Sequence, residues 1–274
     1  MHLSEHQPSD ILKPLIKCYR LIDFDFQTDQ PIPAKAYSPP PEHCLQFFPT
    51  PTQIDYLHNK QQIKPKNALI FGQHTVVNYR TVYKKFLSLQ IVFQPGAISK
   101  LFKFPASLIT NQALDAELVL GREVEAINDQ LYHAKNHQQM IDIAESYLIA
   151  KTRLLQPELN RVDISARQML NSNGIYTLDN FISKSCLCQK QFNRYFLHSV
   201  GISPKAFLRI VRFDEAYRLK NIHPKLSWFK LAIDCSYYDY QHLVKDCKDF
   251  TGYTPQEFFT IGSPERILGT EEVY

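Results

Sequence analysis

The sequence predicts an α+β protein: a mainly antiparallel β domain backed by helices, followed by an all-α domain with two helix-turn-helix units. Three observations predict this arrangement. Prolines and short β-branched or aromatic runs dominate the first 93 residues, apolar residues at helical spacing follow Pro95-Gly96, and two similar helical segments recur near the C-terminus. The length of 274 residues also suits two domains, because single domains average about 100–200 residues.

The first domain is expected to span residues 1–157. Ten of the 17 prolines fall within the first 65 residues, so no long helix can form there. Helical spacing then predicts helices that back the sheet, first from Leu114 to Leu131 and next from Met140 to Leu148. The four runs that are typical of strands, each bounded by Pro, Asn or Gly, are Cys44–Phe48, Ala68–Phe71, Thr75–Tyr79 and Phe86–Phe93.

Composition excludes several classes of protein. With 44% hydrophobic and 21% charged residues, the chain is neither disordered nor collagen-like. No apolar run approaches the ~18 residues that would span a bilayer, and the start of the sequence lacks a basic stretch followed by an apolar one. We therefore expect a cytoplasmic protein with no membrane partner, in which the six cysteines are reduced thiols packed in the core.

An internal repeat marks the second domain, which is expected to span residues 158–261. The segment GISP at 201–204 recurs 51 residues later as GYTP at 252–255, and a phenylalanine follows each segment, Phe207 and Phe258. One such copy would be consistent with any pair of packed helices. Two copies with matched ends favour a repeated helix-turn-helix unit.

Each copy contains the same parts in the same order. A hydroxyl residue that can cap a helix, Thr177 or Ser227, precedes a helix, a short turn and a second helix. A further helix from Pro204 to about Leu219 is expected to connect the two units and to hold them at a fixed separation. Residues 262–274 are expected to form a C-terminal tail.

The second helix of each unit has a polar outward face. In a helix-turn-helix unit this helix can lie in the major groove of DNA, where base edges present distinguishable patterns of donors and acceptors. A solvated helix surface would usually mix acids with bases, but no acid occurs from Gln189 to His198. Residues 158–261 carry 14 basic and 10 acidic residues, whereas residues 1–157 carry 16 and 14, so the shorter segment has the larger positive excess.

Many residues of the second domain match the motif of a known family. They are Phe181-Ile182, Leu187, Phe192, Arg194, Phe196, the GISP segment with Phe207 and Arg212, Trp228, Leu231-Ala232, Ser236-Tyr237, Leu243, Lys245 and the stretch GYTPQEF at 252–258. Through them the segment from about Arg161 to Thr260 resembles the DNA-binding region of the AraC/XylS family of bacterial transcription regulators. The last stretch is the most specific part of the match.

Three positions depart from the family pattern. The family commonly has Gly in each turn, where Cys186 and Ser236 stand, so these turns are expected to be altered. Cys247 stands where the family usually has Phe, which removes buried volume from the second unit. We expect Tyr237 or Tyr238 to fill that space.

The resemblance implies that double-stranded DNA is the partner and suggests which residues contact it. The expected contacts are Gln189, Lys190, Asn193 and Arg194 in the first unit, Arg212 in the linker, and Tyr240, Gln241, His242, Lys245 and Lys248 in the second unit. All except Gln189, Arg212 and Lys248 fall on base-reading positions of the family. Lys248 is expected to meet phosphate, because it lies near the end of its helix.

The first domain carries a less specific resemblance. Pro41–Phe48, Gly72-Gln73 and the segment 92–97, followed by Phe104–Ala106, resemble the uncharacterised domain often attached to AraC-type regulators. Three histidines, His43, His58 and His74, lie near predicted strands, but their spacing fits no metal-ligand motif. We therefore expect no metal and no other cofactor.

The sequence thus predicts a sequence-specific transcription regulator, and not an enzyme, that inserts two recognition helices into successive major-groove segments. RNA polymerase and a second copy of the chain are candidate partners, and the small-molecule effector is unidentified. The alternative is an enzyme or small-molecule sensor in residues 1–157, with the helical region as a docking module. The sequence contains no nucleophile–base constellation, Gly-rich phosphate loop or H-E-x-x-H motif that would support an enzyme.

Overall fold

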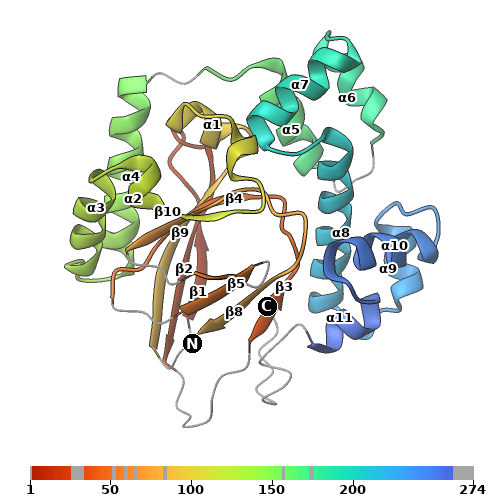
Figure 1. The fold of residues 1–274 in the computed structure, drawn as a ribbon, viewed down its shortest axis with the longest axis horizontal. Coiled ribbons are helices and arrows are strands. Elements are labelled where there is room, and N and C mark those ends of the chain that lie inside the picture. The colour runs from red at the N-terminus through yellow and green to blue at the C-terminus, as the bar shows by residue number, and fades with distance from the viewer. Residues whose placement is uncertain are drawn as a thin grey trace.

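In the computed structural model of the chain, the described residues are 2–25, 34–50, 54–58, 61–63, 67–82, 85–155, 158–172 and 176–261. Strands fill the first part of the chain and helices the rest, as Figure 1 shows. This is the α+β arrangement that the sequence predicts. The expected tail at 262–274 lies outside the described residues.

Two antiparallel sheets form the N-terminal domain. The larger has six strands in the order β1-β2-β9-β4-β7-β10, and the smaller has four in the order β3-β8-β5-β6. All pairings between these strands are antiparallel. The strands are β1 (His2–His6), β2 (Ile16–Asp25), β3 (Lys35–Tyr37), β4 (His43–Phe47), β5 (Ile54–His58), β6 (Gln61–Ile63), β7 (Ala68–Phe71), β8 (Asn78–Val82), β9 (Lys85–Phe93) and β10 (Ala113–Asp115).

The centre of the larger sheet is buried on both faces. Leu45 and Ile91 pair across β4 and β9 and belong to the main apolar core of the domain. Cys44 and Phe71 pair across β4 and β7 and belong to a smaller apolar cluster. Successive side chains of a strand point to opposite faces, so β4 contributes to both clusters.

Helices supply the rest of the main core. The helix α4 (His137–Leu155) buries Met140, Ile141, Ala144 and Leu148, one stripe at helical spacing. The other helical elements of this domain are α1 (Ala97–Phe102), the 3-10 helix η1 (Ala106–Ile109), α2 (Ala116–Leu120) and α3 (Glu123–Tyr132). Leu114, expected at the start of a helix, lies instead on β10, because residues 113–115 pair with β7.

The described part of the C-terminal domain consists of helices around one apolar core. One of them is capped as the sequence predicts, because the hydroxyl of Ser227 accepts the Lys230 N–H at 3.2 Å. The hydroxyl of Ser203, which was not predicted as a cap, accepts the Ala206 N–H at the same distance. The helix α8 joins the two units (Figure 1). The helices are α5 (Arg161–Leu170), α6 (Leu178–Ser185), α7 (Gln189–Val200), α8 (Pro204–Ile222), α9 (Trp228–Asp234), α10 (Tyr240–Thr251) and α11 (Pro255–Ile261).

The strand predictions were incomplete: besides β10, they missed β5 and β6, and they failed at two further places. Before residue 44 the sequence predicted only extended segments and turns, but β1, β2 and β3 lie there. The run Thr75–Tyr79 is a strand only from Asn78 onward. The N–H groups of Thr75 and Val77 donate to the side chain of Asn111 and to the carbonyl of Phe250, so they are not available to a ladder.

Candidate nucleic-acid interface

The first helix-turn-helix unit consists of α6 and α7. At the start of α6 the Thr177 N–H donates to Oδ1 of Asn180 at 3.2 Å. The turn passes through Cys186 at φ 55°, in the left-handed region that glycine adopts most easily. The helix α7 buries Phe192 and Phe196, whose ring centroids are 5.8 Å apart. Its opposite side is therefore free to face solvent.

The exposed side of α7 carries four of the predicted DNA contacts, Gln189, Lys190, Asn193 and Arg194. The guanidinium of Arg194 lies 5.0 Å from the ring centroid of Tyr195, the next residue along the helix. The helix contains no acidic residue, so its outward face combines positive charge with amide groups. Such a face can donate to both phosphate oxygens and base edges.

The second unit consists of α9 and α10. The indole Nε1 of Trp228 donates to Oε1 of Gln256 at 3.2 Å, and the indole ring packs edge-on against Phe259 at 6.0 Å between centroids. The turn passes through Ser236 at φ 59°, the same backbone conformation as Cys186 in the first unit. Both turns thus keep the left-handed geometry without glycine.

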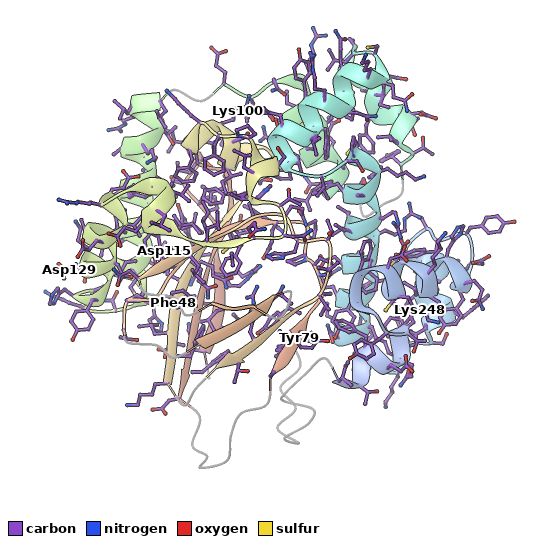
Figure 2. The ribbon with its side chains drawn as sticks, viewed as in Figure 1. Phe48, Tyr79, Lys100, Asp115, Asp129 and Lys248 are labelled. Atoms are coloured by element: carbon purple, nitrogen blue, oxygen red, sulfur yellow. The ribbon has the colours of Figure 1, made fainter. Side chains whose placement is uncertain are left out.

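Asp239 caps the helix α10, and its carboxylate accepts the N–H of His242 at 2.8 Å. This acid is therefore used as a helix cap. Tyr240 is only half-exposed and packs against the helical core, and burial raises its pKa. The predicted contacts that are exposed on α10 are Gln241, His242, Lys245 and Lys248; Figure 2 labels the last of these.

Two exposed tyrosines extend these faces and were not predicted as contacts. Tyr195 on α7 is 41% exposed, and Tyr238, just before α10, is 86% exposed. The ring of Tyr238 stands edge-on to that of His242, with 6.2 Å between centroids. The sequence signal that could have identified them is an aromatic residue at an outward position of a polar helix, for Tyr195, or just before such a helix, for Tyr238.

Arg212 is the predicted contact that packs within the fold. Its guanidinium lies 5.1 Å from the ring centroid of Tyr237, and its Nε is buried with no hydrogen-bond partner among the described residues. Tyr237 is 4% exposed and belongs to the same core as Cys247, whereas Tyr238 is exposed. Of the two tyrosines considered for the space beside Cys247, Tyr237 is therefore the one that packs in the core.

An ion-pair network fixes α10 against α8. Arg209 of α8 lies 2.7 Å from the carboxylate of Asp246 and 2.5 Å from that of Asp249, both on α10. Its guanidinium also lies 5.1 Å from the ring centroid of Phe250. Burial disfavours the charged form of Arg209, but the hydrogen bonds that its guanidinium donates to Asp249 and Asp246 outweigh this effect and raise its pKa. The network determines how the second recognition helix sits on the linker, and sequence analysis did not identify it.

The cysteines differ partly from expectation, and one of the histidines considered for metal binding is buried. Cys186 and Cys188 are exposed, whereas the other four cysteines are buried as expected. His43 is buried, and burial lowers its pKa to about 4 despite a hydrogen bond to the backbone of Val200. Within the described ranges, no three side chains of the kinds that bind metals come together. No helix in this part of the chain is long and apolar enough to cross a membrane.

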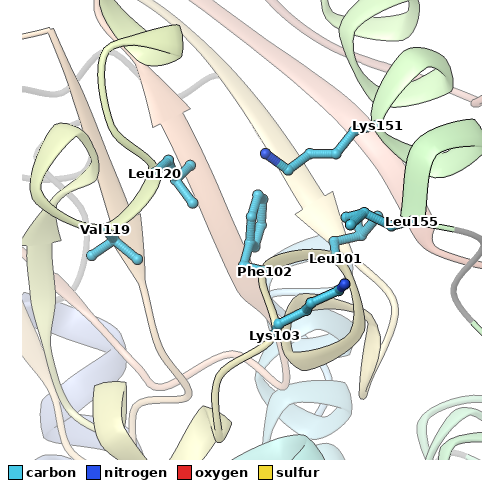
Figure 3. A pocket seen from close by; sticks show the side chains of 7 residues that line it. All are labelled: Leu101, Phe102, Lys103, Val119, Leu120, Lys151 and Leu155. Carbon is cyan, nitrogen blue, oxygen red and sulfur yellow. The ribbon is translucent and has the colours of Figure 1, made fainter.

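A small pocket lies in the N-terminal domain, where α1 meets α2 and the end of α4 (Figure 3). Its volume is about 200 Å³. Lys151 in its wall forms an ion pair with Glu123 and stands 5.1 Å from the ring centroid of Phe102. The side chains that line the pocket are Leu101, Phe102, Lys103, Val119, Leu120, Lys151 and Leu155.

Comparison with known families agrees with both resemblances. Residues 183–260 match the AraC-type family described as "Helix-turn-helix domain", and residues 4–115 match a "Domain of unknown function (DUF6597)". The C-terminal domain is an AraC-type helix-turn-helix domain. Regulators with this domain bind DNA and control transcription, and they are not enzymes. DNA binding is thus the general activity that this domain implies for residues 183–260.

Solved structures of ToxT from Vibrio cholerae are similar to this chain over most of its length, at low sequence identity. The apo form of a ToxT variant from strain SCE256 is 7% identical, with a TM-score of 0.49 over 95% of this chain and 100% of that chain. ToxT from strain O395 bound to (E)-4-(8-methylnaphthalen-1-yl)but-3-enoic acid is 6% identical, with a TM-score of 0.48 over 89% of this chain and 99% of that chain. Likeness at these scores carries no further conclusion. No curated protein matches the chain.

Proposed function

We propose that the chain reads a specific operator with two helices, α7 and α10, which enter successive major-groove segments on one face of the DNA. In this proposal residues 158–261 bind DNA and residues 1–157 regulate that binding. One observation carries it: both helices present exposed polar and basic side chains, while their apolar faces belong to one shared core. RNA polymerase and a second copy of the chain are the further partners we propose.

The exposed side chains suit the two kinds of contact that a reader of DNA needs. Asn193 can bond in bidentate fashion to adenine, and Arg194 to guanine, and each such contact discriminates against a wrong base by about 1–3 kcal/mol. Lys248, in the last turn of α10, is better suited to phosphate, which positions the protein without reading sequence.

The linker has a suitable length for two successive grooves. The 19 residues of α8 span about 28 Å at 1.5 Å per residue. Successive major-groove segments on one face of DNA are about 34 Å apart. The widths of the two units can supply the remaining few ångströms, so a single chain can reach both segments.

A binding assay with the full chain tests this function. Operator DNA is first selected from random duplexes, and affinity is then measured over a salt series. Asn193→Ala should lose about 1–3 kcal/mol on the operator and little on random DNA, whereas Lys248→Ala should weaken both alike and reduce the salt slope by about 1. Lys13→Ala, an exposed lysine of the N-terminal domain, is the control and should change neither.

Two results would contradict the proposal. Absence of salt-sensitive binding to any promoter DNA by the full chain would remove it entirely, because phosphate neutralisation always makes affinity salt-dependent. Equal losses on operator and random DNA for Asn193→Ala would show that the outward face of α7 does not read bases.

A second role, ligand sensing, is favoured by the pocket beside α1. Its walls are apolar apart from two ammonium groups, and Glu123 already pairs with one of these. We infer that it accepts a small apolar carboxylate, with the exposed Lys103 as the counter-ion. A panel of small aliphatic and aromatic acids should raise the melting temperature, whereas their amides and the Lys103→Ala variant should show no shift. Equal shifts with acids and amides would contradict this role for Lys103.

A further inference from the structure

The N-terminal domain holds the first unit at the end of α7. The hydroxyl of Thr110 donates a 2.6 Å hydrogen bond to the carbonyl of Gly201, the residue that ends α7 at φ 89°. A Cβ atom at Gly201 would lie 2.7 Å from Oγ1 of Thr110 and 2.9 Å from the carbonyl oxygen of Ala106. No larger residue fits at this position unless the two domains move apart.

The same domain holds the second unit at the corresponding end of α10. The N–H of Val77 donates a 2.7 Å hydrogen bond to the carbonyl of Phe250, in the last turn of α10. Tyr79 forms a hydrogen bond with Tyr253, and Val77 and Tyr79 both pack against the helical core. Figure 2 labels Tyr79 on the side of the sheet that faces α8 and α11.

These two attachments are joined inside the N-terminal domain. The N–H of Thr75 donates to Oδ1 of Asn111 at 2.7 Å, and Nδ2 of Asn111 donates to Oγ1 of Thr75 at 2.9 Å. Thr75 lies two residues before Val77, and Asn111 directly follows Thr110. We call these four residues the bridge: they connect the end of α7 to the end of α10 without passing through α8.

One ion pair strengthens the junction between the domains, and the electrostatics of a buried carboxyl group shows that α8 is also close to the sheet domain. Lys100 of α1, which Figure 2 labels, lies 3.4 Å from a carboxylate oxygen of Asp163, a fully buried residue of α5. Asp214 of α8 lies in the field of Glu42 in the N-terminal domain: burial raises the pKa of Asp214 to about 7, and the Glu42 carboxylate adds to the rise. The linker helix is thus also close to the sheet domain.

We propose that the bridge acts as a second linker between the two units and thereby selects the spacing of the two half-sites in the operator. This inference rests on the proposed function, because spacing matters only if α7 and α10 both read DNA. The Arg209 network and the shared apolar core already limit how the two units move on α8. The closed ring of α7, α8, α10 and the bridge limits this movement further, since moving one unit must also break a contact with the N-terminal domain. Thr110 and Asn111 are therefore positioning residues.

Four variants separate the bridge from other effects. Asn111→Gly removes the amide but keeps the backbone at φ 57°, which glycine adopts without strain. Thr110→Val removes only the hydroxyl that bonds Gly201. Gly201→Ala introduces the clash with the N-terminal domain. Gly252→Ala is its matched control, because Gly252 ends α10 at φ 81° but has open space around its missing Cβ.

The test uses the full chain and operator duplexes in which the two half-sites are moved apart one base pair at a time. The wild type should prefer one spacing by about tenfold or more, a difference that one or two hydrogen bonds can supply. Asn111→Gly, Thr110→Val and Gly201→Ala should reduce the preference to about threefold or less, while Gly252→Ala keeps it. Fluorescence of Trp228 reports whether each variant is folded. If Gly201→Ala does not fold, the spacing preference of Thr110→Val decides the test.

The outcomes are distinguishable. A wild type that binds the operator without any preference for spacing overturns the inference, and so does an unchanged preference in both Asn111→Gly and Thr110→Val. A wild type that binds no DNA overturns the proposed function instead. A loss of preference in Gly252→Ala equal to that in Gly201→Ala would show that strain at the helix end is the cause, and the bridge would be rejected.

Discussion

Replacing Ser236 by glycine should stabilise the second unit. Ser236 stands in the turn between α9 and α10 at φ 59°, and the left-handed region costs an L-residue about 1–2 kcal/mol. Glycine avoids this cost, but it loses about 0.5–1 kcal/mol more conformational free energy when the chain folds. The difference predicts that Ser236→Gly raises the free energy of unfolding by about 0.5–1 kcal/mol.

The chain contains its own probe for this measurement. Trp228 is the single tryptophan, and it is buried in α9 of the same unit. Urea unfolding followed by its fluorescence should show a midpoint higher by about 0.5 M, for a slope of about 1–3 kcal/mol per molar.

Ser236→Ala is the matched control, because it keeps the Cβ atom and should leave the free energy of unfolding within about 0.5 kcal/mol of the wild type. Cys186→Gly should stabilise the first unit for the same reason. If the urea midpoint of Ser236→Gly is equal to or lower than that of the wild type, while the midpoint of Ser236→Ala is unchanged, the backbone strain inferred from φ does not exist.

Three further predictions concern charge and thiols. Asp214→Asn should match the wild type in stability near pH 4 and exceed it increasingly up to about pH 7. The reason is that burial raises the pKa of Asp214 to about 7, so the folded wild type binds more protons than the unfolded chain over this range and loses stability as pH rises. A difference in the free energy of unfolding between the two proteins that stays the same from pH 4 to pH 7 would contradict this. Asp246→Asn should lower the free energy of unfolding by about 1–3 kcal/mol, read from tryptophan fluorescence, because the buried carboxylate bonds Arg209; no change would mean that Asp249 suffices. Ellman's reagent should react quickly with two thiols of the native chain, Cys186 and Cys188, and with all six in denaturant; operator DNA should protect these two if α7 enters the groove, and four or more fast thiols would contradict the burial of the others.

The helical domain could be predicted from sequence because its signals are local. A polar cap, a stripe of apolar residues and a GISP or GYTP segment mark each unit, and each depends on neighbours within about four residues. The cap at Ser227 and the buried stripe of Phe192 and Phe196 are where these signals predict them. The repeat then adds information that one copy lacks.

The sheet domain was harder to predict because its partners are distant. The strand β2 (Ile16–Asp25) pairs with β9, some 70 residues later, and its sequence IKCYRLIDFD mixes charged and apolar residues without strict alternation. The run Thr75–Tyr79 has strand composition, yet its first N–H groups bond to Asn111 and to the C-terminal domain. Composition indicates which secondary structures a segment can form, and its tertiary contacts determine which of them it adopts.

The helical period of apolar residues predicted that most of the candidate DNA contacts are exposed. It did not predict that Arg212, on the linker helix, packs within the fold. The outward faces of α7 and α10 could be assigned because every third or fourth residue is apolar and buried. Arg212 matches the family motif, but motif matching says nothing about the direction of a side chain, and this one packs over Tyr237. The bridge was beyond sequence reasoning, because two of its contacts, at Gly201 and Phe250, are made to backbone carbonyl groups.

The position of α1 suggests how the pocket and the bridge would communicate. Leu101 and Phe102 of this helix line the pocket, while α1 also packs against α7, and Lys100 reaches the buried Asp163 of α5. A ligand that displaces α1 would therefore act on the first unit directly, and on the second through Asn111 and Thr75 as well as through α8. Because the contact at Gly201 has no spare room, even a small movement of this region must either strain the hydrogen bond from Thr110 or carry the end of α7 with it. Ligand binding is then expected to change the preferred half-site spacing rather than the affinity of each helix for its own groove.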